Sequence, residues 1–311
     1  MNFKELPKKF KIKFLKFWRS DNTKVSLLRD VLIAFFLVLI ILTALWAYTG
    51  QWFGAPMVAI ESGSMMHPNE PFGRIGTIDA GDMVLLVKVN SKSDVVSSGG
   101  NVSGPRVTKS QEHFHYWDYG DVIIYKPYGS DNRDQIIHRA RCWVEYNEEY
   151  DTYTVKEYGI ENDSRGVIIP ELGLTKNCCN GKPYQPTHSG FITKGDNNNA
   201  CDQLYKNLCN EPIKVEWISG KARGELPWIG TINLFFNDIT GGKNTVSNVP
   251  SDSISCLIIL IAVLISIPIT LDVIDYFKTK QKEKENKVLK KEIFKEEKQE
   301  IKEEEKKFDN K

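Results

Sequence analysis

Residues 31–48 read VLIAFFLVLIILTALWAY, an unbroken apolar run near the start of the 311-residue chain. A helix needs roughly 20 residues to cross the hydrocarbon core of a bilayer, and this run is about long enough. A cleavable signal is the alternative, but its apolar region has only roughly 7 to 15 residues and is followed by a small-x-small cleavage site, which this run lacks. We therefore predict a transmembrane helix over 31–48.

The charges on either side of this run predict its orientation. Residues 1–30 carry nine Lys or Arg against three acids, and basic segments next to a span stay in the cytoplasm. A second apolar run, 254–274, contains a proline and a few polar residues but still predicts a span, with a buried core helix as the alternative. Two spans return the Lys/Glu-rich tail, 275–311, to the cytoplasm and leave 49–253 outside.

The whole chain carries 41 basic and 40 acidic residues, for a net charge of +1, and 41% of its residues are hydrophobic. Nucleic-acid-binding domains normally carry a basic excess, so no nucleic-acid partner is expected. We predict a multi-pass protein of the cell membrane with the lipid bilayer as a partner.

The outer segment, 49–253, alternates short stretches rich in Val, Ile and Tyr with turns rich in Gly, Asn and Pro. The stretches expected as strands are MVLLVKV (83–89), DVIIYKP (121–127), YTVKEY (153–158), GFITKG (190–195) and GTINLFF (230–236). This pattern is typical of an antiparallel, mostly β domain. Two segments, near 90–118 and 142–189, are interpreted as loop insertions.

Five cysteines lie in the outer segment, and the sixth, Cys256, lies in the second apolar run. An extracytoplasmic compartment permits disulfides, but an odd number leaves one thiol over, so the pairing stays open. A four-cysteine zinc site is the alternative, although the usual C-x₂₋₄-C pairs are missing. We expect no metal and no cofactor.

A candidate nucleophile lies about 15 residues after the first span, in ESGSMMHP (61–68). Small residues let the backbone turn sharply there and expose a serine hydroxyl. Serine is a poor nucleophile at neutral pH, so catalysis also needs a base within hydrogen-bond reach and donors for the oxyanion. Taken alone, the segment is only a polar turn.

Among the five histidines, His138 is the best candidate base, because it follows the apolar pair Ile136 and Ile137 on an expected strand. An acidic partner is offered by TKGDNNNACD (193–202), which holds Asp196 and Asp202. A carboxylate bonded to the imidazole fixes its tautomer and stabilises the imidazolium formed during attack. Either aspartate could do this, and either could instead cap its turn.

Four blocks and one further aspartate occur in a fixed order: SGSM (62–65), GDVIIY (120–125), IHR (137–139) and KGDNN (194–198) with Asp202. Together they resemble type I signal peptidases of the archaeal and endoplasmic-reticulum kind. The similarity extends through GKARGELPWIG (220–230) and covers roughly 62–232 without the insertions. One departure lies at Met66-His67-Pro68, which is one residue longer than the commonest spacing in the family.

The resemblance implies an antiparallel, mostly β catalytic domain of the signal-peptidase type, anchored by one N-terminal and one C-terminal transmembrane helix. It implies that Ser64 is the nucleophile and that His138 stands where bacterial relatives carry a lysine base. Asp202 and Asp196 are the implied acidic partners; we prefer Asp202 as the partner of His138, with Asp196 holding its turn or a neighbouring charge as the alternative. Ser62 matches the position whose hydroxyl joins the Ser64 N–H in an oxyanion hole.

The implied activity is removal of N-terminal signal peptides from secreted and membrane pre-proteins, with small residues at −1 and −3, near the protein-export channel. In the family the substrate binds as an extended strand, and we expect the edge for it at 83–89 and 121–125. Two alternatives remain open: a serine-lysine protease with Lys88 or Lys126 as its base, and a non-catalytic surface-binding domain.

The short distance in sequence between the first span and Ser64 keeps the site near the bilayer. Aromatic side chains sit favourably at the lipid interface. The residues expected there are Trp52, Phe53, Trp228, Phe235 and Phe236.

Overall fold

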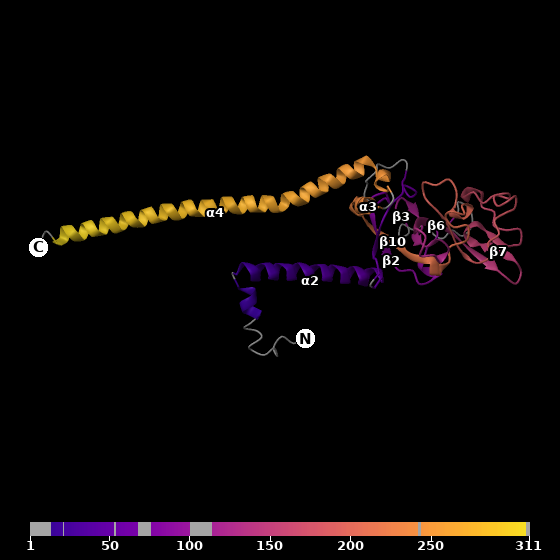
Figure 1. Cartoon of the computed structure of the whole chain (residues 1–311), viewed down its shortest axis with the longest axis horizontal. Helices are drawn as coiled ribbons and strands as arrows, with labels where there is room; N and C mark the ends of the chain where they lie inside the picture. The colour runs from indigo at the N-terminus through magenta and orange to yellow at the C-terminus, as the bar shows by residue number, and fades with distance from the viewer. Residues whose placement is uncertain are drawn as a thin grey trace. The chain divides into compact units, whose positions relative to one another are not determined.

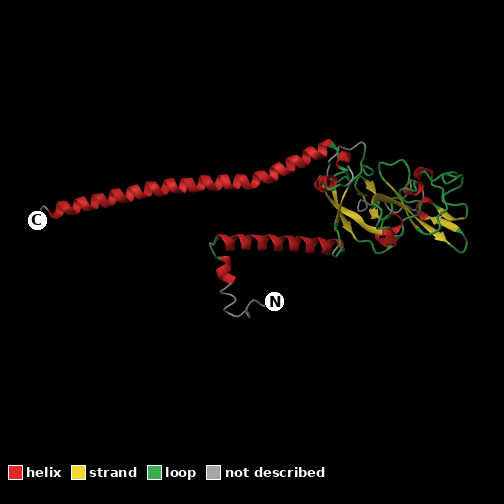
Figure 2. Cartoon of the chain, in the orientation of Figure 1, coloured by secondary structure: helices red, strands yellow, loops and turns green. Residues whose placement is uncertain are grey.

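The computed structural model describes residues 14–20, 22–52, 54–67, 76–99, 114–241 and 244–308, with the backbone alone from residue 287 onward. The chain divides into two units, Met1–Ser253 and Ile254–Lys311. A β-rich domain is flanked in sequence by one long helix on each side (Figures 1 and 2). The prediction of a mostly antiparallel β domain with an apolar helix toward each terminus is confirmed.

Some expectations fall on residues that are not described. These are residues 1–13 and 21 of the basic N-terminal segment, Phe53, and residues 100–113 of the expected loop near 90–118.

Helix α2 (Thr23–Thr49) contains the whole apolar run predicted as the first span. It begins where the Asn22 side chain accepts a hydrogen bond from the Lys24 N–H at 2.9 Å. It ends where Gly50 adopts a left-handed φ of 68° and donates its N–H to the Trp46 carbonyl. Its most apolar window has a mean hydropathy of 2.7 and none of it is buried, so the helix is long and apolar enough to cross a bilayer.

Helix α4 (Ser251–Phe308) begins at the end of the first unit and makes up nearly all of the second, and it contains the predicted span 254–274. An apolar window within Ser251–Asn286 has a mean hydropathy of 2.8, so this helix also has the length and composition of a membrane span. Pro268 lies inside the helix. The helix continues into the Lys/Glu-rich tail, as the good helix propensity of these residues favours.

The β domain is built on an antiparallel sheet. In the described part of the chain its spatial order is β1 (Met57–Ala59), β2 (Met83–Val87), β10 (Ile218–Leu226), β5 (Val122–Tyr125), β6 (Ile136–Asn147), β7 (Thr152–Val155) and β8 (Ile160–Asp163), with β9 (Gly190–Lys194) paired to β6. Strands β3 (Phe114–His115) and β4 (Asp118–Tyr119) form a separate hairpin.

Strand β5 separates two apolar cores. Its four residues are all buried, which explains why they form a continuous apolar run without polar alternation. Successive side chains of a strand point to opposite faces, so Val122 and Ile124 pack into one core and Ile123 and Tyr125 into the other. His138 of β6 pairs with Ile123 and is therefore held at this central position of the sheet.

The free edge of the sheet is not where the sequence predicted it. The stretches 83–89 and 121–125 were expected to offer an edge, but β2 pairs with β1 and β10, and β5 pairs with β10 and β6. Strand β1 ends the sheet order instead and pairs only with β2 among the described strands. That expectation was wrong because strong apolar character marks interior strands.

The strand expected at 230–236 is also wrong, because these residues begin helix α3 (Gly230–Ile239). Its exposed apolar side chains recur at i, i+3, i+4 and i+7, the helical spacing. They are Ile232, Phe235, Phe236 and Ile239. The stretch GTINLFF stops before Ile239 and so hides this period.

Residues 142–189, interpreted as a loop insertion that contains one expected strand at 153–158, form a folded extension of the sheet. The second half of β6 continues into β7 and β8. These strands cover a separate apolar core that includes Val144, Val155, Leu174 and the buried thiols of Cys142 and Cys201. All six cysteines are free thiols, and no group of His, Cys, Asp or Glu in the described residues is arranged to hold a metal ion.

Candidate active site

The nucleophile turn, Gly63–His67, follows β1 and is anchored by apolar side chains on both sides of Ser64. Ile60 and Met65 are 2% and 1% exposed. The Ile60 N–H donates to the Asp82 carbonyl at 2.9 Å, and the Met66 N–H closes the turn on the Gly63 carbonyl at 3.2 Å. Buried anchors and a closed turn thus fix the backbone that carries the Ser64 hydroxyl.

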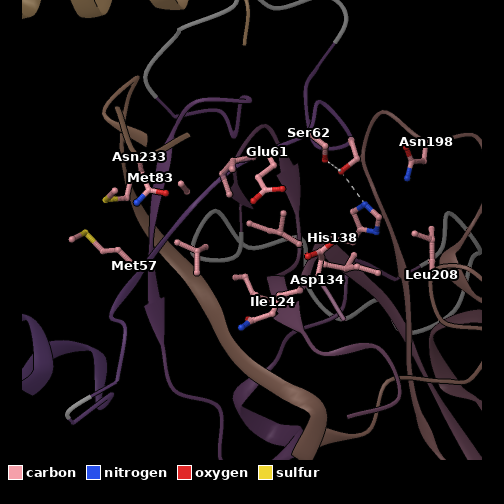
Figure 3. Close-up of a pocket in the computed structure, with 17 residues that line it drawn as sticks. Met57, Glu61, Ser62, Met83, Ile124, Asp134, His138, Asn198, Leu208 and Asn233 are labelled. Atoms are coloured by element: carbon pink, nitrogen blue, oxygen red, sulfur yellow. Dashed lines mark hydrogen bonds between the residues drawn. The ribbon is translucent and has the colours of Figure 1, made fainter. Parts of the chain in front are cut away.

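His138 joins Ser64 to Asp202 in one hydrogen-bonded chain. Its Nε2 lies 3.0 Å from the Ser64 Oγ, and its Nδ1 lies 2.7 Å from the Asp202 Oδ2. Figure 3 shows the imidazole facing the serine hydroxyls at the wall of a pocket. The histidine is 3% exposed, so the strand and its neighbours hold the ring in this orientation.

Asp202 is fully buried. Its Oδ2 accepts hydrogen bonds from two hydroxyls in addition to its bond with the imidazole. Thr193 Oγ1 donates at 2.6 Å and the Tyr125 hydroxyl donates at 2.8 Å. Burial and the charge of Asp202 raise the pKa of Tyr125 well above its usual value, so Tyr125 stays a neutral donor. The Asp202 Oδ1 has no hydrogen-bond partner in the described structure, so the bonds of this carboxylate converge on the oxygen that faces His138.

The structure places Asp196, the other candidate partner, away from the histidine base. Its carboxylate accepts from Arg139 Nε at 2.9 Å and Nη2 at 2.5 Å, and lies 3.1 Å from His67 Nε2. Burial alone would raise the pKa of Asp196, but the bonds from Arg139 and His67 outweigh it and lower the pKa to about 2. Of the two aspartates, Asp202 is the one brought to His138.

Arg139 lies in the IHR block, and the sequence predicted no role for it. It is fully buried, and besides Asp196 its guanidinium bonds carbonyls of the β3–β4 hairpin region. These acceptors are His115, Tyr116, Asp118 and Gly120, at 2.8 to 3.2 Å. The sign of its importance in the sequence was a charged residue directly beside His138 on an apolar strand.

The turn Gly195–Asn198 packs against the nucleophile turn. The Asn197 N–H donates to the Ser64 carbonyl at 2.9 Å, and the Asn197 side-chain amide donates to the Gly63 carbonyl at 3.1 Å. A Cβ on Gly195 would lie 2.6 Å from the Ser64 carbonyl oxygen and 2.8 Å from His138 Nε2. Only glycine therefore lets this turn approach the serine and the histidine together.

Ser62, expected in the oxyanion hole, lies beside the nucleophile, with its Oγ 3.3 Å from the Ser64 Oγ (Figure 3). Its role in binding an oxyanion remains a prediction. Lys126, one of the two alternative bases, instead pairs with Asp131 at 2.5 Å.

Ser64 and His138 open into a groove with a volume of about 570 Å³. Residues of β1, β2, β5, β6 and α3 line it, including Met57, Ala59, Met83, Ile124, Ile137 and Asn233. The carboxylates of Glu61 and Asp134 add negative charge to its walls. Most of the side chains that line the groove are nevertheless apolar, and the candidate nucleophile lies on one side of it.

No protein-family model matches this chain, and no curated protein matches it either.

Proposed function

We propose that this chain is a serine endopeptidase that removes signal peptides from secreted and membrane pre-proteins at the outer face of the cell membrane. The observation that carries the proposal is the bonded chain from the Ser64 hydroxyl through His138 to the buried Asp202, beside an apolar groove. A hydroxyl, a base and an orienting carboxylate at these distances are what acyl transfer through serine requires.

Acylation follows from this geometry. His138 Nε2 accepts the Ser64 proton while Oγ forms a bond to the scissile carbonyl carbon, and the carbonyl oxygen becomes an oxyanion. The imidazolium then gives its proton to the leaving amine nitrogen as the C–N bond breaks. Water, deprotonated by His138, attacks the acyl-enzyme and releases the signal peptide with a free carboxylate, and the proton returns to Ser64.

Asp202 stabilises the imidazolium during these steps. Its carboxylate bonds two neutral hydroxyls, those of Thr193 and Tyr125, and no cationic side chain bonds it in the described structure. Its negative charge is therefore available to the charge that develops on His138. The oxyanion would be bound by the Ser62 hydroxyl and the Ser64 N–H, because donors aimed at developing charge lower the barrier most.

The groove suits an extended peptide. Strand β1 forms its wall and ends the sheet, so its outer edge offers backbone groups to which a substrate strand can pair. Following the resemblance, we take small side chains at −1 and −3 as the preferred ones.

Several features support cleavage of the substrate close to the lipid surface. Helix α2 joins the sheet directly, because the Thr49 carbonyl accepts from the Lys88 N–H at 2.8 Å and the Gln51 side chain donates to the Ser219 carbonyl at 2.7 Å. Helix α3 exposes 53% of Phe235, 61% of Phe236 and 65% of Ile239. Such an apolar face marks a membrane or protein contact. Because α3 also lines the groove through Asn233, a lipid contact there would bring the groove to the membrane.

The proposed orientation places the β domain outside the cell, close to the export channel that delivers pre-proteins. A substrate whose signal peptide lies in the same bilayer then meets the groove at a high effective concentration. Protease added from outside should digest 49–253 and spare both termini. Digestion of either terminus from outside would contradict this orientation.

The activity is tested with the full chain in detergent and a pre-protein carrying a signal peptide. The wild type should cut after the signal peptide, as shown by N-terminal sequencing of the product, and Ser64→Ala should abolish cutting while the fold remains. Ser62→Ala should lose about 10-fold to 1000-fold in rate if it supplies one oxyanion donor. Ser93→Ala is the matched control, because its hydroxyl bonds another serine, Ser91, outside the groove.

An inactive wild type, or a Ser64→Ala variant that still cuts, would overturn the proposal. A rate unchanged in Ser62→Ala would remove only Ser62 from the site.

A further inference from the structure

His67 lies three residues after Ser64, within the segment that departs from the family spacing. Its Nε2 is 3.1 Å from the Asp196 Oδ2, and its side chain is 20% exposed while that of Asp196 is 4% exposed. Neither the sequence nor the proposed mechanism assigns it a role. The chain thus places a second histidine near the nucleophile in sequence, hydrogen-bonded to the aspartate whose other partner is Arg139 and not His138.

Asp196 lies between two basic side chains, Arg139 on one side and His67 on the other. Arg139 Nη2 also donates a hydrogen bond to the Tyr116 carbonyl at 3.0 Å. The cluster therefore ties together the nucleophile turn, the β3–β4 hairpin and the turn that begins at Gly195. We call His67, Asp196 and Arg139 the charge clamp.

The charges in the clamp favour the protonated form of His67. The bond to Asp196 raises the pKa of His67, while burial and the Arg139 charge oppose it without cancelling the rise. A protonated imidazole donates from both nitrogens, so its Nε2 can donate to the Asp196 carboxylate. Among the described residues, Asp196 and Arg139 are the charged groups that act on it.

We propose that His67 is a positioning residue: its bond to Asp196 closes the charge clamp and holds the nucleophile turn where Ser64 reaches His138. This inference rests on the proposed function, because it concerns the geometry of the same reaction. The mechanical link is short, since Asn197, the residue after Asp196, donates two hydrogen bonds to the carbonyls of Gly63 and Ser64.

The protonation of His67 makes the proposed activity depend on pH. The clamp is strongest when His67 is protonated, so its contribution is complete below the pKa of His67 and is lost as the pH rises through that value. His138 must instead be neutral to accept the serine proton, so activity falls in acid. The two histidines together give a bell-shaped profile, with its alkaline limb set by His67.

The test compares His67→Gln with wild type, using the full chain in detergent from acidic to alkaline pH. Glutamine keeps an N–H donor for Asp196 but never becomes charged. We expect kcat to fall about 10-fold at neutral pH with KM nearly unchanged, since loss of alignment lowers turnover, and the alkaline limb to disappear. His188→Gln is the matched control, because His188 is 19% exposed and pairs with Glu211 at a similar 3.2 Å.

The outcomes separate this inference from the proposed function. A wild type that cuts and a Ser64→Ala variant that does not would support the peptidase, and a His67→Gln variant with the wild-type kcat and alkaline limb would then overturn the clamp. A variant that is only less stable, with unchanged kcat for the folded protein, would overturn it too.

NMR of ring-labelled histidines tests the same inference without a measurement of peptidase activity. The His138 resonances should shift in His67→Gln as Ser64 moves away and stay unchanged in His188→Gln. Unchanged His138 resonances in His67→Gln would overturn the inference even if the peptidase activity fails.

Discussion

Asp196 and Asp202 lie six residues apart, yet their surroundings are opposite in kind. Asp202 is bonded by two neutral hydroxyls and the imidazole of His138. Asp196 is bonded by a buried guanidinium and a second histidine. The charge of Asp196 is already shared between Arg139 and His67, whereas Asp202 is held by neutral hydroxyls and bonds His138 itself, so its charge is available to an imidazolium at His138. The partners of each aspartate therefore assign Asp202 to proton transfer and Asp196 to holding the turns in place.

The largest expected loss of kcat comes from variants of Asp202 and of His138, to which it is bonded. His138→Ala and Asp202→Ala should each be nearly inactive, with losses of about 10⁴-fold or more in kcat, because each removes a member of one catalytic unit. The double variant should lose little more than either single one. The rates are measured on a pre-protein with folded protein at equal concentration.

Additive losses, with substantial turnover in each single variant, would mean that His138 and Asp202 do not act together. Full activity in His138→Ala would point to a lysine base.

A smaller loss is expected where the two regions meet, at Gly195. An alanine Cβ there would press on the Ser64 carbonyl and on His138, and a displacement of about 1 Å can cost about 100-fold in rate. We expect Gly195→Ala to lose about 100-fold in kcat while near-UV circular dichroism shows a retained fold.

Gly54→Ala is the control, because the added Cβ would find only ordinary contacts of 3.5 Å or more. Wild-type kcat in Gly195→Ala would show that the two turns can separate without harm.

Asp196→Asn should cost stability more than rate. Asparagine keeps a carbonyl for the Arg139 guanidinium but leaves that buried cation without its counter-ion, and breaking a buried pair typically costs about 3 to 5 kcal/mol. We expect an unfolding free energy lower by about 3 kcal/mol, with kcat of the folded protein reduced about 10-fold at most, whereas Asp202→Asn should lose far more rate. Urea unfolding of the full chain in detergent measures the difference.

The same variant changes the acid stability with a predictable sign. The pKa of Asp196 is lowered from 3.8 to about 2, so its contribution is present above about pH 4 and is lost as the pH falls toward 2. Asp196→Asn should lack this part of the acid dependence. An unaltered acid transition, or a rate loss equal to that of Asp202→Asn, would contradict the division of roles.

The first apolar helix and the central strand of the sheet could be predicted from the sequence, because each is marked by a continuous local run of apolar residues. The run at 31–48 and the apolar VIIY of β5 are fixed by composition and period. The sequence favoured Asp202 over Asp196 but did not settle the choice, since both lie in the same polar turn region and only the fold brings Arg139 to Asp196 and His138 to Asp202. The role of His67 was missed for the same reason, because its partner is 129 residues away in the chain.

Two predictions about the fold were also wrong for physical reasons. Helix α3 was taken for a strand because its helical period becomes complete only at Ile239. Residues 142–189 were interpreted as a loop insertion with only 153–158 expected as a strand, because the strands there are short and separated by turns, although Val144, Val155 and Leu174 bury a core of their own.

The smallest expected effect tests how much the neutral donors contribute to the Asp202 side. Tyr125→Phe removes one hydroxyl from the Asp202 Oδ2 and leaves Thr193 and His138 bonded to it. A hydrogen bond to a charged group contributes about 1.5 to 3 kcal/mol, so we expect the unfolding free energy to fall by about that amount. The kcat should change by only about 3-fold, because the remaining bonds still hold the carboxylate against the imidazole. Tyr128→Phe is the control, since its hydroxyl bonds Asn210 and not Asp202. A loss of about 100-fold in kcat for Tyr125→Phe would contradict the comparison, because it would show that Asp202 orients His138 only while all of its donors are present.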